Sequence, residues 1–320
     1  MNILCLSPID QSALEHLRRD HDVTVAANGD HGDLHALVPD REVVIFRSGV
    51  TISGDFIDDS PGLKLLIRAG SGLDNVDVER ARARDIRLVR IPGPGAQAVA
   101  ELTFALMLNV ARNVTLADRL LREGHWPKKD LGGPLLHGKT LGIVGAGNIG
   151  ARVGDLGVAW GMRVLGCVAH PTDACREALA ARGIELAPMD EVVAAADYLT
   201  IHVPLRDATQ KLVNVDLLAR MKPGSILINT ARGGVVDEAA LRDALVGGTR
   251  LRGAGLDVHP QEGEGTQSPL ADLPNVVLTP HIGAMATDSQ REIGERIIRL
   301  LAAFRAGQID AEAARGEAVA

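Results

Sequence analysis

Three polar residues in the second half of the chain each follow a stretch with the composition of a β-strand. Arg232 stands in N-T-A-R-G-G, Glu262 lies shortly after G-L-D-V, and His281 stands in P-H-I-G. The carboxyl ends of parallel strands meet at one edge of a sheet, where open α/β sheets bind their ligands. Imidazole and carboxylate groups can move protons, and a guanidinium can bind an anion. The spacing therefore predicts that these three side chains converge at one site.

Each of these residues also has an ordinary structural interpretation when taken alone. A histidine after a proline is more often a hydrogen-bonded structural residue, and an arginine after a strand is more often an ion-pair partner. Glu262 lies in a polar loop, Gln261 to Ser268, where an exposed carboxylate is the usual case. Glu264 lies two residues further on, so the residues alone leave both carboxylates open.

A glycine-rich stretch in the middle of the chain indicates a dinucleotide site. The apolar run Leu141 to Val144 leads into G-A-G-N-I-G, and a helical pattern follows. Gly145 permits a tight turn, Gly147 lets the backbone approach a pyrophosphate, and Gly150 lets helix and strand pack closely. The first residues of the helix, Asn148 and Ile149 among them, then offer free N–H groups and the positive end of the helix dipole to the anion.

Strand and helix patterns alternate along most of the chain, which predicts α/β architecture with parallel sheets covered on both faces. The expected strands before the glycine-rich stretch are Asn2–Leu6, Asp22–Ala26, Glu42–Phe46, Lys64–Ile67 and Ile86–Ile91. Those after it are Val164–Val168, Tyr198–Val203, Ser225–Asn229, Ala254–Val258 and Val276–Leu278, and they complete a doubly wound sheet of about six strands.

The expected domains are 96–283 for dinucleotide binding and a discontinuous substrate domain made of 1–95 and 284–320. Pro92 to Gly95, P-G-P-G, interrupts the periodic pattern at the first boundary. Ala96 to Glu123 could form one long helix. A last helix, which Thr287 or Asp288 could cap, has an apolar face and is expected to pack on the first domain.

Composition excludes several classes of protein. A formal net charge of −7 argues against a general nucleic-acid binder, and no apolar run approaches the ~18 residues of a membrane span. Cys5, Cys167 and Cys175 have no metal-ligand or redox spacing, so no metal site is expected. We expect a soluble cytoplasmic protein whose partner is a small molecule.

In combination, these motifs resemble those of the D-isomer-specific 2-hydroxyacid dehydrogenases. The stretches K-T-L-G-I-V-G-A-G-N-I-G, H-V-P-L, N-T-A-R-G-G-V-V-D-E, G-L-D-V and T-P-H-I-G occur in the order and spacing of that family, as does R-A-G-S-G-L-D-N-V-D in the first domain. The chain resembles the 3-phosphoglycerate dehydrogenases in particular, without their regulatory domain. The resemblance implies a Rossmann domain inserted in a flavodoxin-like substrate domain, and a homodimer formed through the dinucleotide domain.

The resemblance also implies roles for the residues. His281 would exchange a proton with the keto or hydroxyl oxygen as hydride passes to or from the nicotinamide, with Glu262 as its partner. Arg232 and the backbone N–H groups of Ser71 and Gly72 would bind the substrate carboxylate, in a cleft between domains. The further residues expected at the cofactor are His202, Val203, Pro204, Thr230, Ala231, Asp257 and Gly283.

The sequence departs from the family pattern where the cofactor ribose is expected. An acidic residue usually lies about 20 residues past the glycines, but Val168 ends this strand. The missing acid favours NADP, yet no arginine stands at the strand end, and Arg176 lies further on. His170 could bind either ribose and Asp173 could replace the acid, which leaves a slight preference for NAD.

The substrate is expected to be a D-2-hydroxy or 2-keto acid, best represented by 3-phosphoglycerate. Arg47 and Arg68 match family positions that face substrate, and Lys128 matches a basic position that reaches the site of the neighbouring subunit. Three cations suit a second anionic group. If they are ordinary surface charges, a glyoxylate or hydroxypyruvate reductase, or another 2-keto acid reductase, is the alternative. Another alternative is formate or phosphite oxidation on the same scaffold, but formate dehydrogenases have Gln in place of Glu262, which argues against it. A different class, a dinucleotide-sensing protein like the C-terminal-binding-protein corepressors, shares this fold.

Overall fold

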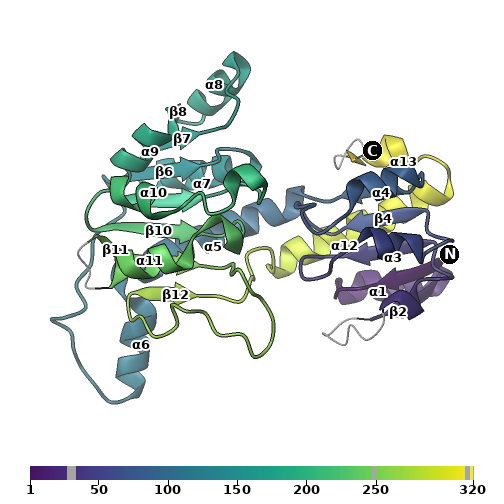
Figure 1. Ribbon diagram of the computed structural model, residues 1–320, viewed down its shortest axis with the longest axis horizontal. Helices are drawn as coiled ribbons and strands as arrows, with labels where there is room; N and C mark the ends of the chain where they lie inside the picture. The colour runs from purple at the N-terminus through teal and green to yellow at the C-terminus, as the bar shows by residue number, and fades with distance from the viewer. Residues whose placement is uncertain (27–33, 247–249, 314–317, 320) are drawn as a thin grey trace. The chain divides into compact units, whose positions relative to one another are not determined.

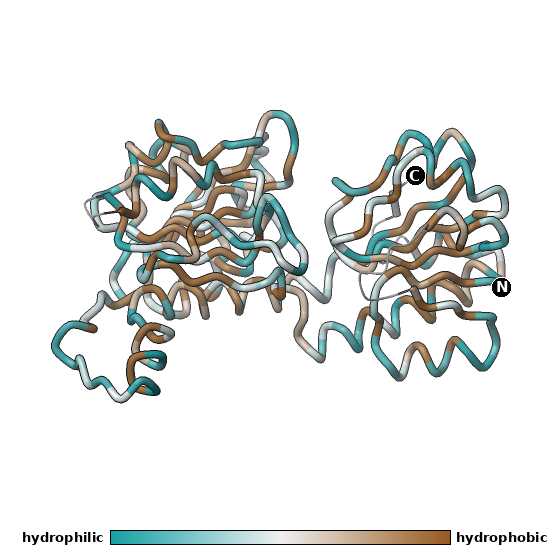
Figure 2. Tube along the Cα trace, turned by 60° about the horizontal axis from the view of Figure 1, so that its bottom comes forward, coloured by the Kyte–Doolittle hydropathy of each residue, from teal (hydrophilic) through white to brown (hydrophobic). Residues whose placement is uncertain are grey.

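The computed structural model describes residues 1–26, 34–246, 250–313 and 318–319. The chain divides into two compact units, Met1–Ala98 with Ala284–Ala320, and Val99–Gly283. Each unit has its own sheet with helices on its faces (Figure 1). In Figure 2 the strands of both units are largely apolar, in agreement with the buried positions in both sheets.

The first unit contains a six-stranded sheet in the order β13-β5-β4-β3-β1-β2. Its first five strands pair in parallel, which gives the flavodoxin-like order 2-1-3-4-5, and β13 pairs antiparallel with β5. The elements are β1 (Asn2–Cys5), α1 (Gln11–Asp20), β2 (Asp22–Val25), α2 (Leu34–Leu37), β3 (Val43–Phe46), α3 (Gly54–Asp58), β4 (Leu65–Arg68), α4 (Val78–Ala83), β5 (Arg87–Arg90), α12 (Thr287–Arg305), α13 (Ile309–Ala313) and β13 (Ala318–Val319).

Helix α12 belongs to the first unit although it lies near the end of the chain. Its residues Ile293, Ile297 and Leu301 are buried in one cluster with Ile3 of β1 and Leu17 of α1. The helix begins without a side-chain cap, because Ala286 occupies the N-cap position. The expectation that Thr287 or Asp288 caps it is therefore wrong: the chain enters the helix one residue earlier.

The second unit contains a seven-stranded parallel sheet in the order β12-β11-β10-β9-β6-β7-β8. Renumbered from β6, this is the doubly wound order 3-2-1-4-5-6-7, with the reversal between β6 and β9. The elements are α6 (Val114–Arg122), β6 (Thr140–Val144), α7 (Asn148–Ala159), β7 (Arg163–Cys167), α8 (Asp173–Ala180), β8 (Ile184–Leu186), α9 (Met189–Ala195), β9 (Tyr198–Ile201), the 3₁₀ turn η1 (Asp207–Thr209), α10 (Val215–Arg220), β10 (Ser225–Asn229), η2 (Gly233–Val235), α11 (Glu238–Leu245), β11 (Leu251–Leu256) and β12 (Val276–Leu278).

Two expectations about helices are wrong. Helix α5 (Gly93–Arg112) begins inside P-G-P-G, because a proline in the first helical turn loses no intrahelical hydrogen bond. The stretch up to Glu123 is also two helices, α5 and α6, because Asn113 adopts a left-handed backbone conformation with φ 52°. The Asn109 side chain then receives the N–H of Thr115 at 2.8 Å, which satisfies one donor of the new helix start.

Candidate active site

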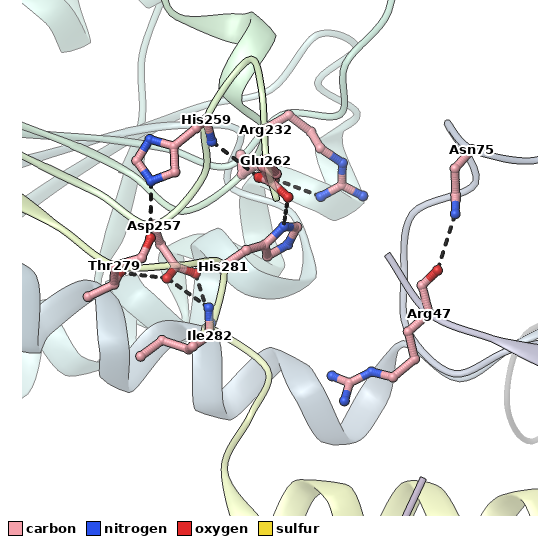
Figure 3. A network of polar contacts seen from close by, with 11 residues as sticks. Arg47, Asn75, Arg232, Asp257, His259, Glu262, Thr279, His281 and Ile282 are labelled. Atoms are coloured by element: carbon pink, nitrogen blue, oxygen red, sulfur yellow. Dashed lines mark hydrogen bonds and ion pairs between the residues drawn. The ribbon is translucent and has the colours of Figure 1, made fainter. Parts of the chain in front are cut away.

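His281 and Glu262 form a hydrogen-bonded pair at the carboxyl edge of the second sheet (Figure 3). The imidazole Nδ1 lies 2.7 Å from Glu262 Oε2. The side chains are 25% and 35% exposed, so the pair can be reached by a small molecule. Since the carboxylate can only accept, Nδ1 carries the proton of this bond, and Nε2 is left to exchange a proton with a ligand.

The Glu262 carboxylate is held from two sides and is kept charged. Its other oxygen, Oε1, accepts the backbone N–H of His259 at 3.2 Å. Burial works to raise the pKa of Glu262, but the hydrogen bond from His281, the charge of that imidazole and the contributions of His259 outweigh it, so the pKa lies below its usual value. The ionised Glu262 therefore accepts the Nδ1–H of His281 and holds the ring in one orientation.

Asp257 fixes the loop that carries His281. Its carboxylate is almost fully buried and accepts three hydrogen bonds, from the Thr279 hydroxyl at 2.6 Å, the Ile282 N–H at 2.9 Å and the Gly283 N–H at 2.8 Å. His281 itself has a φ of 54°, and its N–H donates to the Asp257 carbonyl at 2.7 Å. A non-glycine residue in this region is held there by its surroundings, which is common at functional sites.

Arg232 lies on a turn that the side chain of Asn229 holds in place. The Asn229 amide donates to the Arg232 carbonyl at 2.9 Å, and its oxygen accepts the Ala231 N–H at 3.0 Å. The guanidinium of Arg232 donates to the Ala231 carbonyl at 2.7 Å. Thr230 is buried and pairs through its hydroxyl with Thr103 at 3.0 Å. Hydrogen bonds within the chain therefore hold the turn in this conformation.

The glycine-rich turn has the geometry that a pyrophosphate requires. Gly145 has φ 97°, and a Cβ there would lie 2.6 Å from the His202 carbonyl oxygen. A Cβ on Gly150 would overlap the Gly145 carbonyl, so only glycine lets helix and strand approach this closely. Gly147 is the N-cap of α7, makes no side-chain cap, and faces open space. The free N–H groups at the start of α7, from Asn148 and Ile149 onward, suit an anion.

A cavity of about 390 Å³ lies beside this turn. Gly145, Val168, Ala169, Arg176 and Val203 are among its mostly apolar lining residues, a composition that suits an adenine ring. Val168, where an acid was expected, thus lies at the cavity wall, and Arg176 reaches the same cavity. His170 is exposed and is not part of this lining.

His202 lies under the glycine turn as a neutral residue. Its Nε2 is 2.9 Å from the Thr200 hydroxyl, and burial lowers the pKa of His202 to about 3. The neighbouring Val203 lines the cavity, while Pro204 directs its carbonyl to the Thr209 hydroxyl at 2.6 Å. His202 is therefore suited to packing and not to proton transfer.

In the first unit, Ser71 and Gly72 follow β4, and arginines hold their carbonyl groups. Arg90 donates to the Ser71 carbonyl at 3.3 Å, and Arg68 Nε donates to the Gly72 carbonyl at 3.0 Å. In a trans peptide the following N–H points the opposite way, so these bonds orient the N–H of Gly72 and that of Leu73 away from the arginines. Arg68 is only 4% exposed, so it holds the loop and is poorly placed to meet a ligand directly.

Arg47 and Lys128 have very different surroundings. Arg47 follows β3, donates to Gln290 Oε1 at 2.8 Å and to Met285 Sδ at 3.0 Å, and receives the Asn75 amide at its own carbonyl (Figure 3). Burial lowers the pKa of its guanidinium. Lys128 lies in the second unit, on an exposed turn beside Trp126, which is 79% exposed.

Some residues that shape the site were missed from the sequence. They are Asn229, Thr103 and Arg90, which hold site loops, and the pair His259 and Glu238, whose side chains are 15% and 10% exposed. Glu238 and Asn229 stand inside N-T-A-R-G-G-V-V-D-E, and His259 directly follows G-L-D-V. Their positions in or beside these motifs could have marked them as candidate site residues. Their contacts could not be predicted, because they depend on which strands are neighbours in the sheet.

Comparisons with known proteins identify the family of the chain. The sequence profile of the D-isomer specific 2-hydroxyacid dehydrogenase NAD binding domain matches residues 104–283. The hydroxypyruvate reductase of Thermotoga maritima is 38% identical over 296 residues, which cover 91% of this chain and 94% of that protein. The D-3-phosphoglycerate dehydrogenase of Mycobacterium tuberculosis H37Rv is 40% identical over 87% of this chain, which spans only 52% of that longer protein.

A solved structure has the same fold. The D-lactate dehydrogenase of Aquifex aeolicus, complexed with NAD and lactic acid, superposes with a TM-score of 0.84 at 27% identity, covering 97% of each chain. In the described ranges no helix combines the length and the apolar composition needed to cross a membrane. The predicted fold class and the predicted family are confirmed, and the chain is an oxidoreductase that belongs to the D-isomer-specific 2-hydroxyacid dehydrogenases.

Proposed function

We propose that this enzyme interconverts a D-2-hydroxy acid and its 2-keto acid, with Arg232, Glu262 and His281 as catalytic residues. The observation that carries the proposal is the 2.7 Å bond between His281 Nδ1 and Glu262 Oε2, which leaves Nε2 to exchange a proton with the substrate oxygen. Arg232 binds the substrate carboxylate with its planar fork and polarises the carbonyl oxygen. The backbone N–H groups of Ser71 and Gly72 are also proposed to bind substrate, and the bond from Arg90 to the Ser71 carbonyl orients the N–H of Gly72.

NAD(H), when bound, supplies or accepts the hydride. The start of α7 would hold its pyrophosphate, and the 390 Å³ cavity would hold its adenine. The Gly283 N–H donates to the Asp257 carboxylate at 2.8 Å. In this proposal both residues contribute to nicotinamide binding by holding the loop that carries His281. We favour NAD over NADP. Val168 removes the acid that would repel a 2′-phosphate, but no arginine stands at the end of β7 to bind one, and Arg176 is the one cation among the described residues that line the cavity. Comparing kcat/KM for NADH and NADPH tests this preference.

The proposed substrate carries a second anionic group, as 3-phosphoglycerate does. Arg47 is half-buried, and among the described residues its guanidinium donates to two neutral side chains, those of Gln290 and Met285. A desolvated cation with only neutral partners is costly, and an anionic ligand would relieve that cost. Arg47 follows β3 and Ser71 follows β4, and these strands are parallel neighbours, so both lie at one edge of the first sheet. In this proposal Arg68 holds the loop that carries Gly72, and Lys128 adds an exposed positive charge that can attract an anionic substrate.

A panel of 2-keto acids with NADH tests the substrate. The panel is 3-phosphohydroxypyruvate, hydroxypyruvate, glyoxylate, pyruvate and 2-ketoglutarate, and the phosphorylated acid is expected to have the highest kcat/KM. Arg47→Ala should raise KM for the phosphorylated acid far more than for glyoxylate. Gln290→Ala removes a neutral partner of Arg47 but keeps the cation, so it is the matched control. Equal effects of Arg47→Ala on both acids would instead support a small-acid reductase.

We further propose a homodimer formed through the second unit, acting in the cytoplasm. Helix α6 has no buried residue, and Val114, Leu121, Trp126 and Leu135 are each more than half exposed. The free thiols Cys5, Cys167 and Cys175 suit a reducing compartment. Sedimentation of the wild type should give a dimer, and Leu121→Asp combined with Trp126→Asp should give a monomer. A wild-type monomer at micromolar concentration would exclude the dimer.

A further inference from the structure

A second imidazole–carboxylate pair, His259 and Glu238, lies next to the first. His259 Nδ1 is 3.8 Å from Glu238 Oε1, and both atoms are buried without a hydrogen-bond partner among the described residues. Asp257 and Val258 connect the end of β11 to His259, and Glu238 is the first residue of α11. Orphaned polar atoms of this kind are rare in folded proteins and call for an explanation.

The hydrogen bonds of His259 determine where its protons must lie. Nε2 is 3.1 Å from the Thr279 carbonyl, which can only accept, so Nε2 carries a proton. In a neutral ring the lone pair of Nδ1 would then face the Glu238 carboxylate, which is repulsive. The contact becomes attractive when Nδ1 is also protonated, and the ring is then an imidazolium paired with an anionic carboxylate. The carboxylate of Glu238 correspondingly raises the pKa of His259, against the effect of burial.

His259 contacts the loops of all three catalytic residues in this unit. Its backbone N–H donates to Glu262, its ring donates to Thr279 two residues before His281, and its backbone leaves no room for a Cβ on Gly233, next to Arg232. In Figure 3 the His259 ring lies above Thr279, and a dashed line joins its backbone nitrogen to Glu262. A movement of this one residue would disturb each of the three loops.

We propose that His259, protonated and paired with Glu238, is the positioning residue that holds Glu262 charged and aligned with His281. The inference rests on the proposed catalytic roles of Glu262 and His281. The other charged groups around the pair are accounted for: Asp257 bonds the His281 loop, Asp237 pairs with Lys211 at 3.1 Å, and Arg232 donates to the Ala231 carbonyl. His259 therefore faces Glu238 from α11 and Glu262 from its own loop.

Titration of the protein by ¹H–¹⁵N NMR of histidine rings gives the direct test. The His259 resonances, identified by their loss in His259→Gln, should titrate with a midpoint above the ordinary value of about 6.5. Glu238→Gln should lower that midpoint by about one pH unit or more. Glu185→Gln removes a carboxylate from an exposed pair with Arg163 and should leave the midpoint unchanged. A wild-type midpoint at or below 6.5, or no response to Glu238→Gln, overturns the proposal.

The kinetic test compares pH profiles of kcat/KM. His259→Gln keeps a side-chain donor for the Thr279 carbonyl but removes the positive charge, so Glu262 should accept a proton more readily. The acid limb should move to higher pH by about 0.5–1 unit, and Glu238→Gln should move it in the same direction. A uniform loss of rate with an unshifted profile would mean a structural role only, and overturns the proposal. The variant His281→Asn separates a failure of the proposed function from a failure of this inference. Full activity in that variant refutes the proposed function, whereas the NMR midpoint of His259 still tests the pairing of His259 with Glu238.

Discussion

Replacing Asp257 with asparagine should destabilise the second unit more than it weakens cofactor binding. The carboxylate accepts on both oxygens: Oδ1 takes the Thr279 hydroxyl and the Ile282 N–H, and Oδ2 takes the Gly283 N–H. An asparagine amide has one acceptor and one donor, so either orientation places its NH₂ against a backbone N–H. One charge-assisted bond is lost, worth about 1.5–3 kcal/mol, and one buried N–H is left without an acceptor, at about 1–3 kcal/mol.

The expected loss is therefore about 2.5–6 kcal/mol in the free energy of unfolding, or roughly 5–24 °C in Tm for a domain of this size. Urea denaturation followed by fluorescence measures the loss, and titration with NADH measures the cofactor affinity of the folded protein. Thr279→Val is the matched control: it removes one hydroxyl donor and should cost about 1 kcal/mol. If Asp257→Asn unfolds within 0.5 kcal/mol of the wild type while NADH binding falls sharply, Asp257 acts on the cofactor and our reasoning about the loop is refuted.

The remaining predictions concern the glycine turn, the buried histidine and the anion-binding arginine. Gly150→Ala adds a Cβ that overlaps the Gly145 carbonyl and should raise the Kd for NADH at least about tenfold, or 1.4 kcal/mol, in a fluorescence titration; an unchanged Kd would contradict the close packing. The pKa of His202 is depressed to about 3, so the unfolded state binds its proton more readily. The contribution of this group to the free energy of unfolding is complete above about pH 6.5 and falls at lower pH by up to about 1.4 kcal/mol per pH unit. Urea denaturation at several pH values should show a smaller slope in His202→Asn. Arg232→Ala should lower kcat/KM about a thousandfold, or 4 kcal/mol, in steady-state assays, and a loss below tenfold would mean that another group binds the carboxylate.

The sequence was most informative where chemistry follows directly from backbone geometry. The glycines of G-A-G-N-I-G are needed because a Cβ at Gly145 or Gly150 has no room, and that requirement is visible as residue type alone. Likewise, the fold class and the carboxyl-edge positions of Arg232 and His281 follow from alternating strands and helices.

Features that depend on tertiary contacts could not be predicted in the same way. Strand β8 has only three residues, too few for a periodic pattern, so the expected six-stranded sheet has seven strands. The break at Asn113 lies inside a continuous helical pattern, and only its left-handed backbone marks it. Arg68 stands in R-A-G-S-G, where we expected it to face substrate, but its buried side chain bonds its own loop. That orientation depends on packing and is not visible in the sequence.

The choice between Glu262 and Glu264 shows how the fold decides what composition leaves open. Both carboxylates stand in one polar loop, and both residues are exposed, so burial does not separate them. Glu262 uses each oxygen for a different partner, Oε2 for the His281 ring and Oε1 for the His259 N–H, so two separate loops fix its orientation. A general base or its carboxylate partner gains from such preorganisation because no reorientation is needed during the reaction. A carboxylate held by one bond alone would turn freely about it, and the His281 ring would lose the direction of its remaining nitrogen.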